Sequence, residues 1–237
     1  MKKSLLFILF TLFLLSCEDK KKAVDLKEDS SEEKIIVQDS IEEAKITSER
    51  EKEKESFVYL TNENVTSFLT EYGKENLEQN VSLITNLGTI ELLLYNDTPL
   101  HRANFIYMLK NGYWDTTFFH RVVDNFIVQA GNSDRKETST MRSKLGKYTI
   151  PAEIKYGHNR GALAAAKEYR ANPDDRSSSY EFYIVQSSGG ANHLNPNYTV
   201  FGRVNSGMEV VDKIAKLETD GSEWPYSNVF IEAKIKD

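Results

Sequence analysis

One short stretch of the chain combines residue types that can do chemistry in an apolar setting. Residues 118–131 place an arginine, Arg121, and a glutamine, Gln129, among aromatic and aliphatic side chains. In a strand, Arg121 shares a face with Val123, and Gln129 shares a face with Ile127. An arginine fixed beside an apolar pocket offers rigid hydrogen-bond donors where water is scarce. The alternative is a structural ion pair of Arg121 at a strand edge, and the stretch alone leaves both interpretations open.

The sequence lacks the motifs of several other kinds of enzyme. It holds no P-loop, no GxSxG motif and no HExxH motif. Its four histidines, His101, His120, His158 and His193, are scattered and have no partners at metal-ligand spacing, so we expect no metal and no cofactor. The single cysteine, Cys17, excludes an intramolecular disulfide framework and a Cys-rich zinc site. Proteolysis, phosphoryl transfer and metal-dependent hydrolysis therefore have no support.

The charge of the chain is concentrated in one segment. The 237 residues carry a formal net charge of −6, which argues against a nucleic-acid-binding protein. Residues 18–56 hold 14 Asp and Glu and 9 Lys and Arg, with no aromatic residue, proline or glycine. Such a segment cannot bury enough apolar surface to offset the entropy lost on ordering. We expect residues 17–56 to form a disordered tether; the alternative is a segment that folds on a partner.

The first residues are typical of an export signal. Two lysines precede an apolar run over residues 5–15, which is too short to span a bilayer as a helix of about 20 apolar residues. The run ends in Leu-Leu-Ser-Cys at Cys17, which resembles a bacterial lipobox, where the thiol receives a diacylglycerol. We expect a signal peptide over residues 1–16 and a lipid anchor on Cys17, at a bacterial envelope membrane and facing the periplasm or the exterior. The alternatives are an ordinary signal peptide with an incidental cysteine, or an uncleaved anchor.

Hydrophobic spacing predicts a β-rich domain after the tether. Helices are expected within residues 61–79, 97–111 and 207–217. Strands are expected at 81–85, 89–95, 118–123, 126–130, 162–166, 181–186, 199–204 and 228–236, and a loop at 132–148. Many short strands with a helix near each end suggest a closed β-barrel capped by helices. Residues 57–80 are then a helical lead-in, and residues 81–237 form the barrel domain.

Five groups of residues occur in an order typical of one enzyme family. They are Gly88-Thr89-Ile90; Thr98-Pro99 with Asn104-Phe105; Phe119-His120-Arg121 through Gly131; Gly161 through Ala166 with Ser177 through Ile184; and His193-Leu194-Asn195 with Val200 through Met208. Together they resemble the cyclophilin family of peptidyl-prolyl cis–trans isomerases over about residues 81–237. The resemblance implies a mainly β fold, a closed eight-stranded antiparallel barrel with two capping helices, preceded here by an extra N-terminal helix.

The resemblance also implies a reaction and a set of site residues. Arg121, Gln129 and Phe126 are the expected catalytic residues: Arg121 hydrogen-bonds the substrate carbonyl, Gln129 orients Arg121, and Phe126 lines the proline pocket. The further substrate-binding residues implied are Ile127, Ala166, Lys167, Glu181, Tyr183, His193, Leu194 and Tyr198. Rotation about an X–Pro bond makes and breaks no covalent bond, so the reaction needs no cofactor. The implied partners are proline-containing unfolded or flexible polypeptides, bound by a monomer.

Four positions depart from the usual family pattern. Tyr183 stands where a phenylalanine is usual, and its hydroxyl needs a partner or must point outward. His193 stands where many eukaryotic members have tryptophan, which implies weak cyclosporin binding, and Tyr198 stands where histidine is frequent. Glu181 replaces a glutamine near the catalytic arginine, so its carboxylate could pair with Arg121 and hold it away from substrate.

Three hypotheses follow for the function. The first is an active prolyl isomerase that assists the folding of cell-envelope proteins. The second is a barrel that binds proline-containing segments without catalysis, as a chaperone or scaffold, and Glu181 is the feature that favours it. The third is a purely structural lipoprotein.

Overall fold

The computed structural model describes residues 58–167 and 172–236. The expected signal peptide, Cys17 and the expected tether lie outside these residues. The described residues belong to one unit of the chain, Ser56–Asp237. Within this unit, no described helix is both long enough and apolar enough to cross a membrane.

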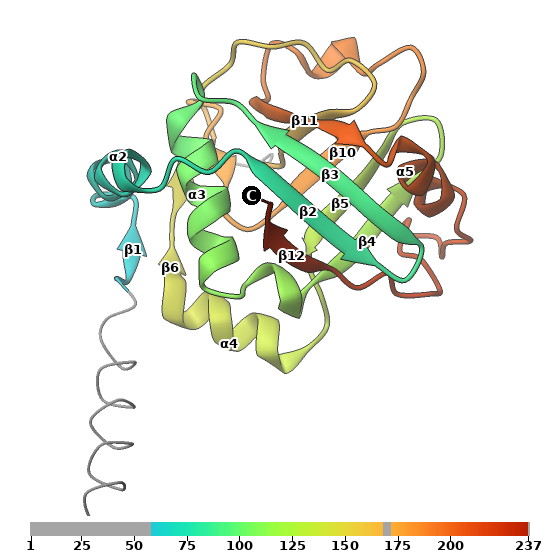
Figure 1. Cartoon of the computed structure of the whole chain (residues 1–237), viewed down its shortest axis with the longest axis horizontal. Helices are drawn as coiled ribbons and strands as arrows, with labels where there is room; N and C mark the ends of the chain where they lie inside the picture. The colour runs from blue at the N-terminus through green and yellow to red at the C-terminus, as the bar shows by residue number, and fades with distance from the viewer. Residues whose placement is uncertain (1–57, 168–171, 237) are drawn as a thin grey trace, which may run out of the picture. The chain divides into compact units, whose positions relative to one another are not determined.

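An antiparallel sheet of eight strands forms the body of the unit (Figure 1). From edge to edge its strands are β12 (Glu232–Ile235), β2 (Asn80–Thr85), β3 (Gly88–Leu94), β11 (Val200–Ser206), β8 (Ala162–Ala165), β10 (Phe182–Val185), β5 (Ile127–Asn132) and β4 (Phe118–Val123). The two edges of the sheet meet at an isolated bridge between Phe118 and Phe230, and the Phe119 N–H donates to the Val229 carbonyl at 3.1 Å. The eight antiparallel strands are present as predicted, but the sheet curls into a half-barrel and not the predicted closed barrel, because its two edge strands, β12 and β4, are not paired with each other along their length.

Alternation along the strands separates an inner core from an outer apolar cluster. On β5, Val128 and Ala130 pack into the large core inside the curled sheet. Ile127, one residue away, belongs to a second cluster with Tyr183 and Tyr198. Successive side chains of a strand point to opposite faces, so the strands β5, β8, β10 and β11 contribute to both clusters. The outer cluster is the apolar base of the candidate site.

The helices and short strands surround the sheet. They are α2 (Val65–Glu75), α3 (Pro99–Lys110), α4 (Lys136–Leu145) and α5 (Met208–Ala215), the parallel pair β1 (Leu60–Thr61) and β6 (Gly146–Lys147), and the antiparallel pair β7 (Thr149–Ile150) and β9 (Ser177–Ser178). Helix α3 begins with Pro99, and a distant carboxylate caps its first turn: Glu153 accepts from the N–H groups of Leu100 and His101 at 3.2 and 3.0 Å. These donors have no partner inside the helix, so the carboxylate stabilises its start.

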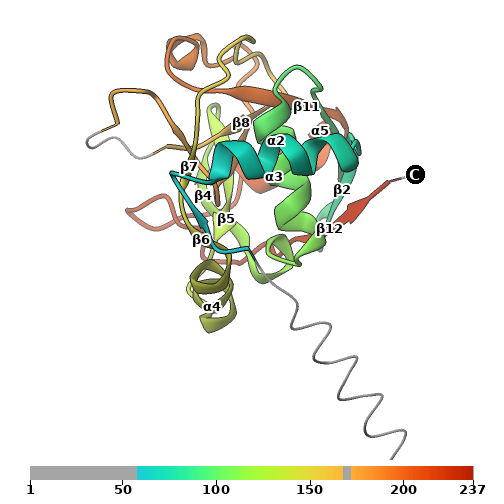
Figure 2. The ribbon, with the colours of Figure 1, turned by 90° about the vertical axis from the view of Figure 1, so that its left-hand side faces the viewer.

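The lead-in helix α2 packs across α3 (Figure 2). Its apolar side chains Val65 and Leu69 are buried in the main core. Arg102 of α3 donates to the carbonyls of Gly73 and Asn76, at 2.9 and 2.6 Å, at the C-terminal end of α2. The lead-in is therefore part of the folded unit.

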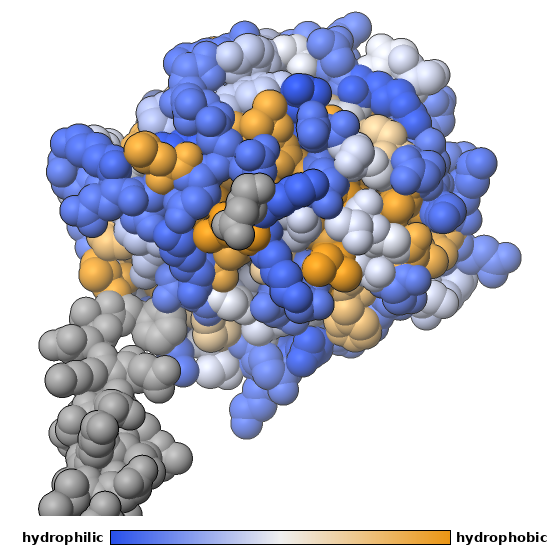
Figure 3. Space-filling view, in the orientation of Figure 1, coloured by the Kyte–Doolittle hydropathy of each residue, from blue (hydrophilic) through white to orange (hydrophobic). Residues whose placement is uncertain are grey.

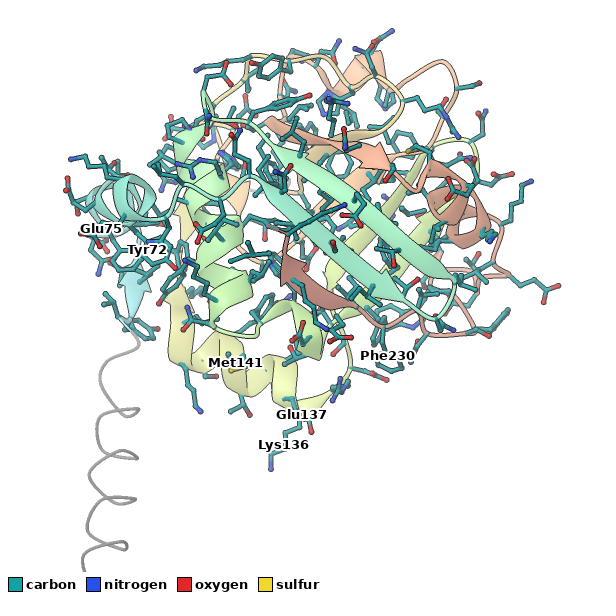
Figure 4. All side chains as sticks on the ribbon, in the orientation of Figure 1. Tyr72, Glu75, Lys136, Glu137, Met141 and Phe230 are labelled. Carbon is teal, nitrogen blue, oxygen red and sulfur yellow. The ribbon has the colours of Figure 1, made fainter. Side chains whose placement is uncertain are left out.

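Helix α4 occupies the region expected to be a loop. Its sequence is polar, and Lys136 and Glu137 lie at its outer end (Figure 4). Only Met141 and Leu145, four residues apart, pack against the main core. The buried Thr138 hydroxyl donates to the Thr116 carbonyl at 2.7 Å. One apolar pair is too weak a periodic signal to predict a helix from sequence, and tertiary contacts supply the rest.

Candidate active site

A row of paired residues crosses three neighbouring strands on the outer face of the sheet. Arg121 of β4 lies opposite Gln129 of β5, and Gln129 lies opposite Tyr183 of β10. Tyr183 in turn lies opposite Ala164 of β8. Side chains of directly paired residues lie on the same face of an antiparallel sheet. The register therefore places the guanidinium, the amide and the phenol of this row side by side.

A cavity of about 320 Å³ opens along this row. Its lining consists of Arg121, Phe126, Ile127, Gln129, Ala166, Lys167, Tyr183, Leu194 and Tyr198. All nine are residues that the family resemblance implied. Two other implied residues, Glu181 and His193, lie beside the cavity and do not line it.

The base of the cavity is apolar and shielded from water. Ile127 and Tyr183 are only 3% and 2% exposed, and Ala166 and Tyr198 are buried beside them. Phe126 projects from the turn between β4 and β5, and the His193 ring stacks on it with centroids 5.4 Å apart. Burial of this kind strengthens any hydrogen bond that a polar group makes at the edge of the cavity.

The Tyr183 hydroxyl has a buried partner. It lies 2.8 Å from Nε2 of His158, and Nδ1 of His158 lies 2.9 Å from Oδ1 of Asn195. The same amide oxygen accepts the His158 backbone N–H at 2.7 Å. An amide oxygen can only accept, so Nδ1 carries the proton and the hydroxyl donates to Nε2. Burial, opposed by the Asn195 hydrogen bond and reinforced by the His193 charge, lowers the pKa of His158.

Glu181 is a hydrogen-bond partner of Gln129. Its carboxylate accepts from Nε2 of Gln129 at 2.9 Å and lies 3.7 Å from Nε2 of His120 and 3.5 Å from Nη2 of Arg142. Burial favours a higher pKa for Glu181, but hydrogen bonds and positive charge from these groups outweigh it and lower the pKa. The ion pair between Glu181 and Arg121 that the sequence left open is not formed. The Glu181 carboxylate lies instead beside Gln129, His120 and Arg142.

Arg121 pairs instead with a carboxylate from a distant loop. Its Nε donates to Oε2 of Glu223 at 2.6 Å, across 102 residues of sequence. Arg121 and Glu223 are both half-buried, with side chains 35% and 44% exposed. This pair could not be predicted from the sequence, because no local spacing relates two positions 102 residues apart.

A second cavity of about 390 Å³ adjoins the first and shares Ala166 and Lys167 with it. Arg142, Arg176 and Glu181 are among its lining residues. The Lys167 ammonium pairs with Asp175 and lies 4.6 Å from the centre of the Tyr198 ring. Lys167 thus forms the boundary between the two cavities. In the part of the chain that the structure describes, no group of three His, Cys, Asp or Glu side chains could hold a metal ion.

The protein is an antiparallel half-barrel that carries this row of residues and this cavity on its outer face. Comparison of the sequence with known families identifies the class to which it belongs. The model of the cyclophilin type peptidyl-prolyl cis-trans isomerase family matches residues 80–235, and the chain belongs to that family.

Curated relatives and solved structures show the same similarity. A peptidyl-prolyl cis-trans isomerase of Acinetobacter baylyi is 37% identical over 143 residues, which are 59% of this chain and 73% of the relative. Peptidyl-prolyl cis-trans isomerase A of Dickeya dadantii is 34% identical, over 63% of this chain and 77% of the relative. The fold is similar to a Cryptosporidium parvum cyclophilin crystallised with the dipeptide Ala-Pro, with a TM-score of 0.55, 24% identity, and coverage of 67% of this chain and 99% of that one.

Proposed function

We propose that this chain is a peptidyl-prolyl cis–trans isomerase that acts on proline-containing segments of unfolded or flexible cell-envelope proteins. The observation that carries the proposal is the placement of Arg121 and Gln129 at the edge of a water-shielded cavity of about 320 Å³. The family membership and the names of the curated relatives support the reaction. The export signal and the lipobox-like residues before Cys17 support the location.

The reaction rotates an amide bond whose resonance sets a barrier of roughly 18–20 kcal/mol. Catalysis requires tighter binding of the twisted amide than of either planar form. In this proposal the proline ring enters the apolar cavity lined by Phe126, Tyr183 and Leu194. The Arg121 guanidinium donates to the substrate carbonyl oxygen and approaches the prolyl nitrogen as that nitrogen loses conjugation. Gln129, held by Glu181, contacts the substrate backbone beside it.

The decisive test is the isomerisation rate of a proline tetrapeptide in a protease-coupled assay with the full chain. We expect acceleration over the uncatalysed rate, and a loss of about 100-fold in kcat/KM for Arg121→Ala, because one positioned donor is removed. Arg203→Ala, at an exposed arginine of β11, is the matched control and should keep wild-type activity.

Two results would count against the proposal. An unaccelerated reaction with the wild-type chain would leave peptide binding without catalysis as the function. Wild-type activity in a folded Arg121→Ala chain would remove Arg121 from the mechanism, and thermal denaturation of both variants shows whether they fold.

A further inference from the structure

The loop between α5 and β12 places a carboxylate beside Arg121. Residues 218–226 fold back on themselves: the Asp220 carboxylate accepts from the N–H groups of Ser222 and Trp224 at 2.8 and 3.0 Å. The Tyr226 N–H donates to the Glu218 carbonyl at 3.0 Å and closes the loop. These hydrogen bonds within the loop hold its backbone in one defined shape.

The loop is also fastened to β4, the strand that carries Arg121. The Trp224 ring packs edge-on against Phe118, with centroids 5.3 Å apart, and lies 5.9 Å from the His120 ring. The Glu223 carbonyl accepts the Val122 N–H at 2.9 Å. β4 is an edge strand, so this N–H is available to the loop. Glu223 is therefore held next to Arg121 by backbone and neighbouring side chains, independently of its carboxylate.

Glu223 adopts a backbone conformation that side-chain-bearing residues rarely take. Its φ is +64°, in the left-handed region that favours glycine or asparagine. A glutamate at this position suggests that the carboxylate has a use that offsets the conformational cost. Its bond to Nε of Arg121 at 2.6 Å is that use.

The hydrogen bond from Nε to Glu223 determines the orientation of the Arg121 guanidinium relative to the cavity. A guanidinium is planar, so fixing Nε fixes the plane in which its two terminal amino groups lie. Within residues 58–167 and 172–236, those amino groups make no hydrogen bond, and Arg121 lines the cavity while Glu223 does not. The terminal donors therefore remain available for a substrate carbonyl.

We propose that Glu223 is a positioning residue that holds Arg121 through Nε and presents its terminal amino groups to the X–Pro amide. The inference rests on the proposed isomerase function. A half-exposed ion pair adds little to stability, so the role of Glu223 lies in orientation. Losing a fixed orientation lowers turnover more than it lowers peptide affinity, because the apolar base still binds the proline ring.

The test compares variants at Glu223 in the full chain, with kcat from the protease-coupled assay and Kd from titration with a proline peptide. We expect Glu223→Ala and Glu223→Gly to lower kcat about tenfold and to change Kd less than about twofold. Glycine relieves the left-handed backbone, so a loss in both variants comes from the carboxylate and not from loop strain. Glu223→Gln keeps an oxygen that accepts from Nε and should recover part of the lost turnover.

Glu218→Ala is the matched control. Glu218 belongs to the same loop, and its exposed side chain lies apart from Arg121, so wild-type kcat is expected. If the wild-type chain is active and Glu223→Ala keeps its kcat within twofold, the role of Glu223 is overturned while the proposed function stands. If the wild-type chain is inactive, the proposed function itself fails. A kcat loss in Glu223→Ala that Glu223→Gln does not relieve at all would also overturn positioning through Nε.

Discussion

The phenol in the floor of the cavity is satisfied by His158, a histidine for which the sequence indicates no metal-ligand partner. His158 joins Tyr183 to Asn195, and Asn195 follows Leu194, which forms the cavity wall. A buried hydroxyl without a partner costs about 1–3 kcal/mol, so His158 makes tyrosine tolerable where a phenylalanine is usual in the family. The floor and one wall of the cavity are thus joined through a single imidazole.

This imidazole predicts a stability that depends on pH. Burial lowers the pKa of His158 from its ordinary value of 6.5, so the folded chain takes up its proton less readily than the unfolded chain. The resulting stability is fully present above pH 6.5 and is lost as the pH falls toward the lowered pKa, by at most about 1.4 kcal/mol per pH unit. We expect the free energy of urea unfolding to decrease between pH 7.5 and 5.5.

His158→Gln should flatten this dependence, because an amide can meet the same partners and does not titrate. His193→Gln, at an exposed ring, should leave most of it intact. An unchanged slope in the His158 variant would show that another group is responsible.

At the scale of elements, the lead-in helix α2 is a component of the fold and not a spacer. It contributes Val65 and Leu69 to the main core, and Arg102 caps its last carbonyls. The family match begins only at residue 80, so α2 is an addition to the matched region. It packs mainly against α3 and also contacts β7, and no residue of these two elements lines the cavity of about 320 Å³.

Leu69→Ala should therefore lower stability and leave catalysis unchanged. Leu69 is 1% exposed, and truncating a buried leucine costs about 2–5 kcal/mol through lost contacts and the cavity left behind. Urea denaturation of the full chain measures the loss, and kcat at low temperature should equal that of the wild type. Thr66→Ala, one turn earlier on the exposed side, is the control. A loss below about 0.5 kcal/mol would mean that α2 is only loosely attached.

At the scale of the whole molecule, the chain joins a folded isomerase-like unit to a segment of different composition. The surface over β2 and β3 is mostly hydrophilic, with isolated apolar side chains (Figure 3). Phe230, an exposed aromatic ring near the base of the view in Figure 4, lies 5.6 Å from the Arg135 guanidinium. Membrane attachment, in our proposal, comes from Cys17 and not from the folded unit.

Cys17→Ala should release the protein from membranes when it is expressed in a lipoprotein-processing bacterium. The lipid on the thiol is the proposed anchor, and the apolar run of residues 5–15 is too short to replace it. Immunoblots of soluble and membrane fractions measure the distribution. Ser16→Ala keeps a small residue before the cysteine and should stay in the membrane fraction. Retention of Cys17→Ala there would mean that the apolar run itself is the anchor.

The sequence by itself determined the main elements of the fold, and its family resemblance implied most residues of the cavity. Period-two and period-3.6 patterns are local, so the main strands and the helices α2, α3 and α5 lie within a few residues of their predicted places. Nine implied residues share one cavity: the strand register brings Arg121, Ile127, Gln129 and Tyr183 to one face, and the loops beside the strands supply the other five.

Only the tertiary structure decided which distant polar groups pair and where the helix α4 forms. Arg121 pairs with Glu223 and not with Glu181, Tyr183 pairs with His158, and the polar helix α4 forms on contacts with the core. Each of these depends on groups that are distant in the chain and close in space. Ion pairs and single hydrogen bonds leave no periodic pattern in a sequence. The partner of Arg121 therefore follows only from the curled sheet, which brings the loop of Glu223 to the strand β4.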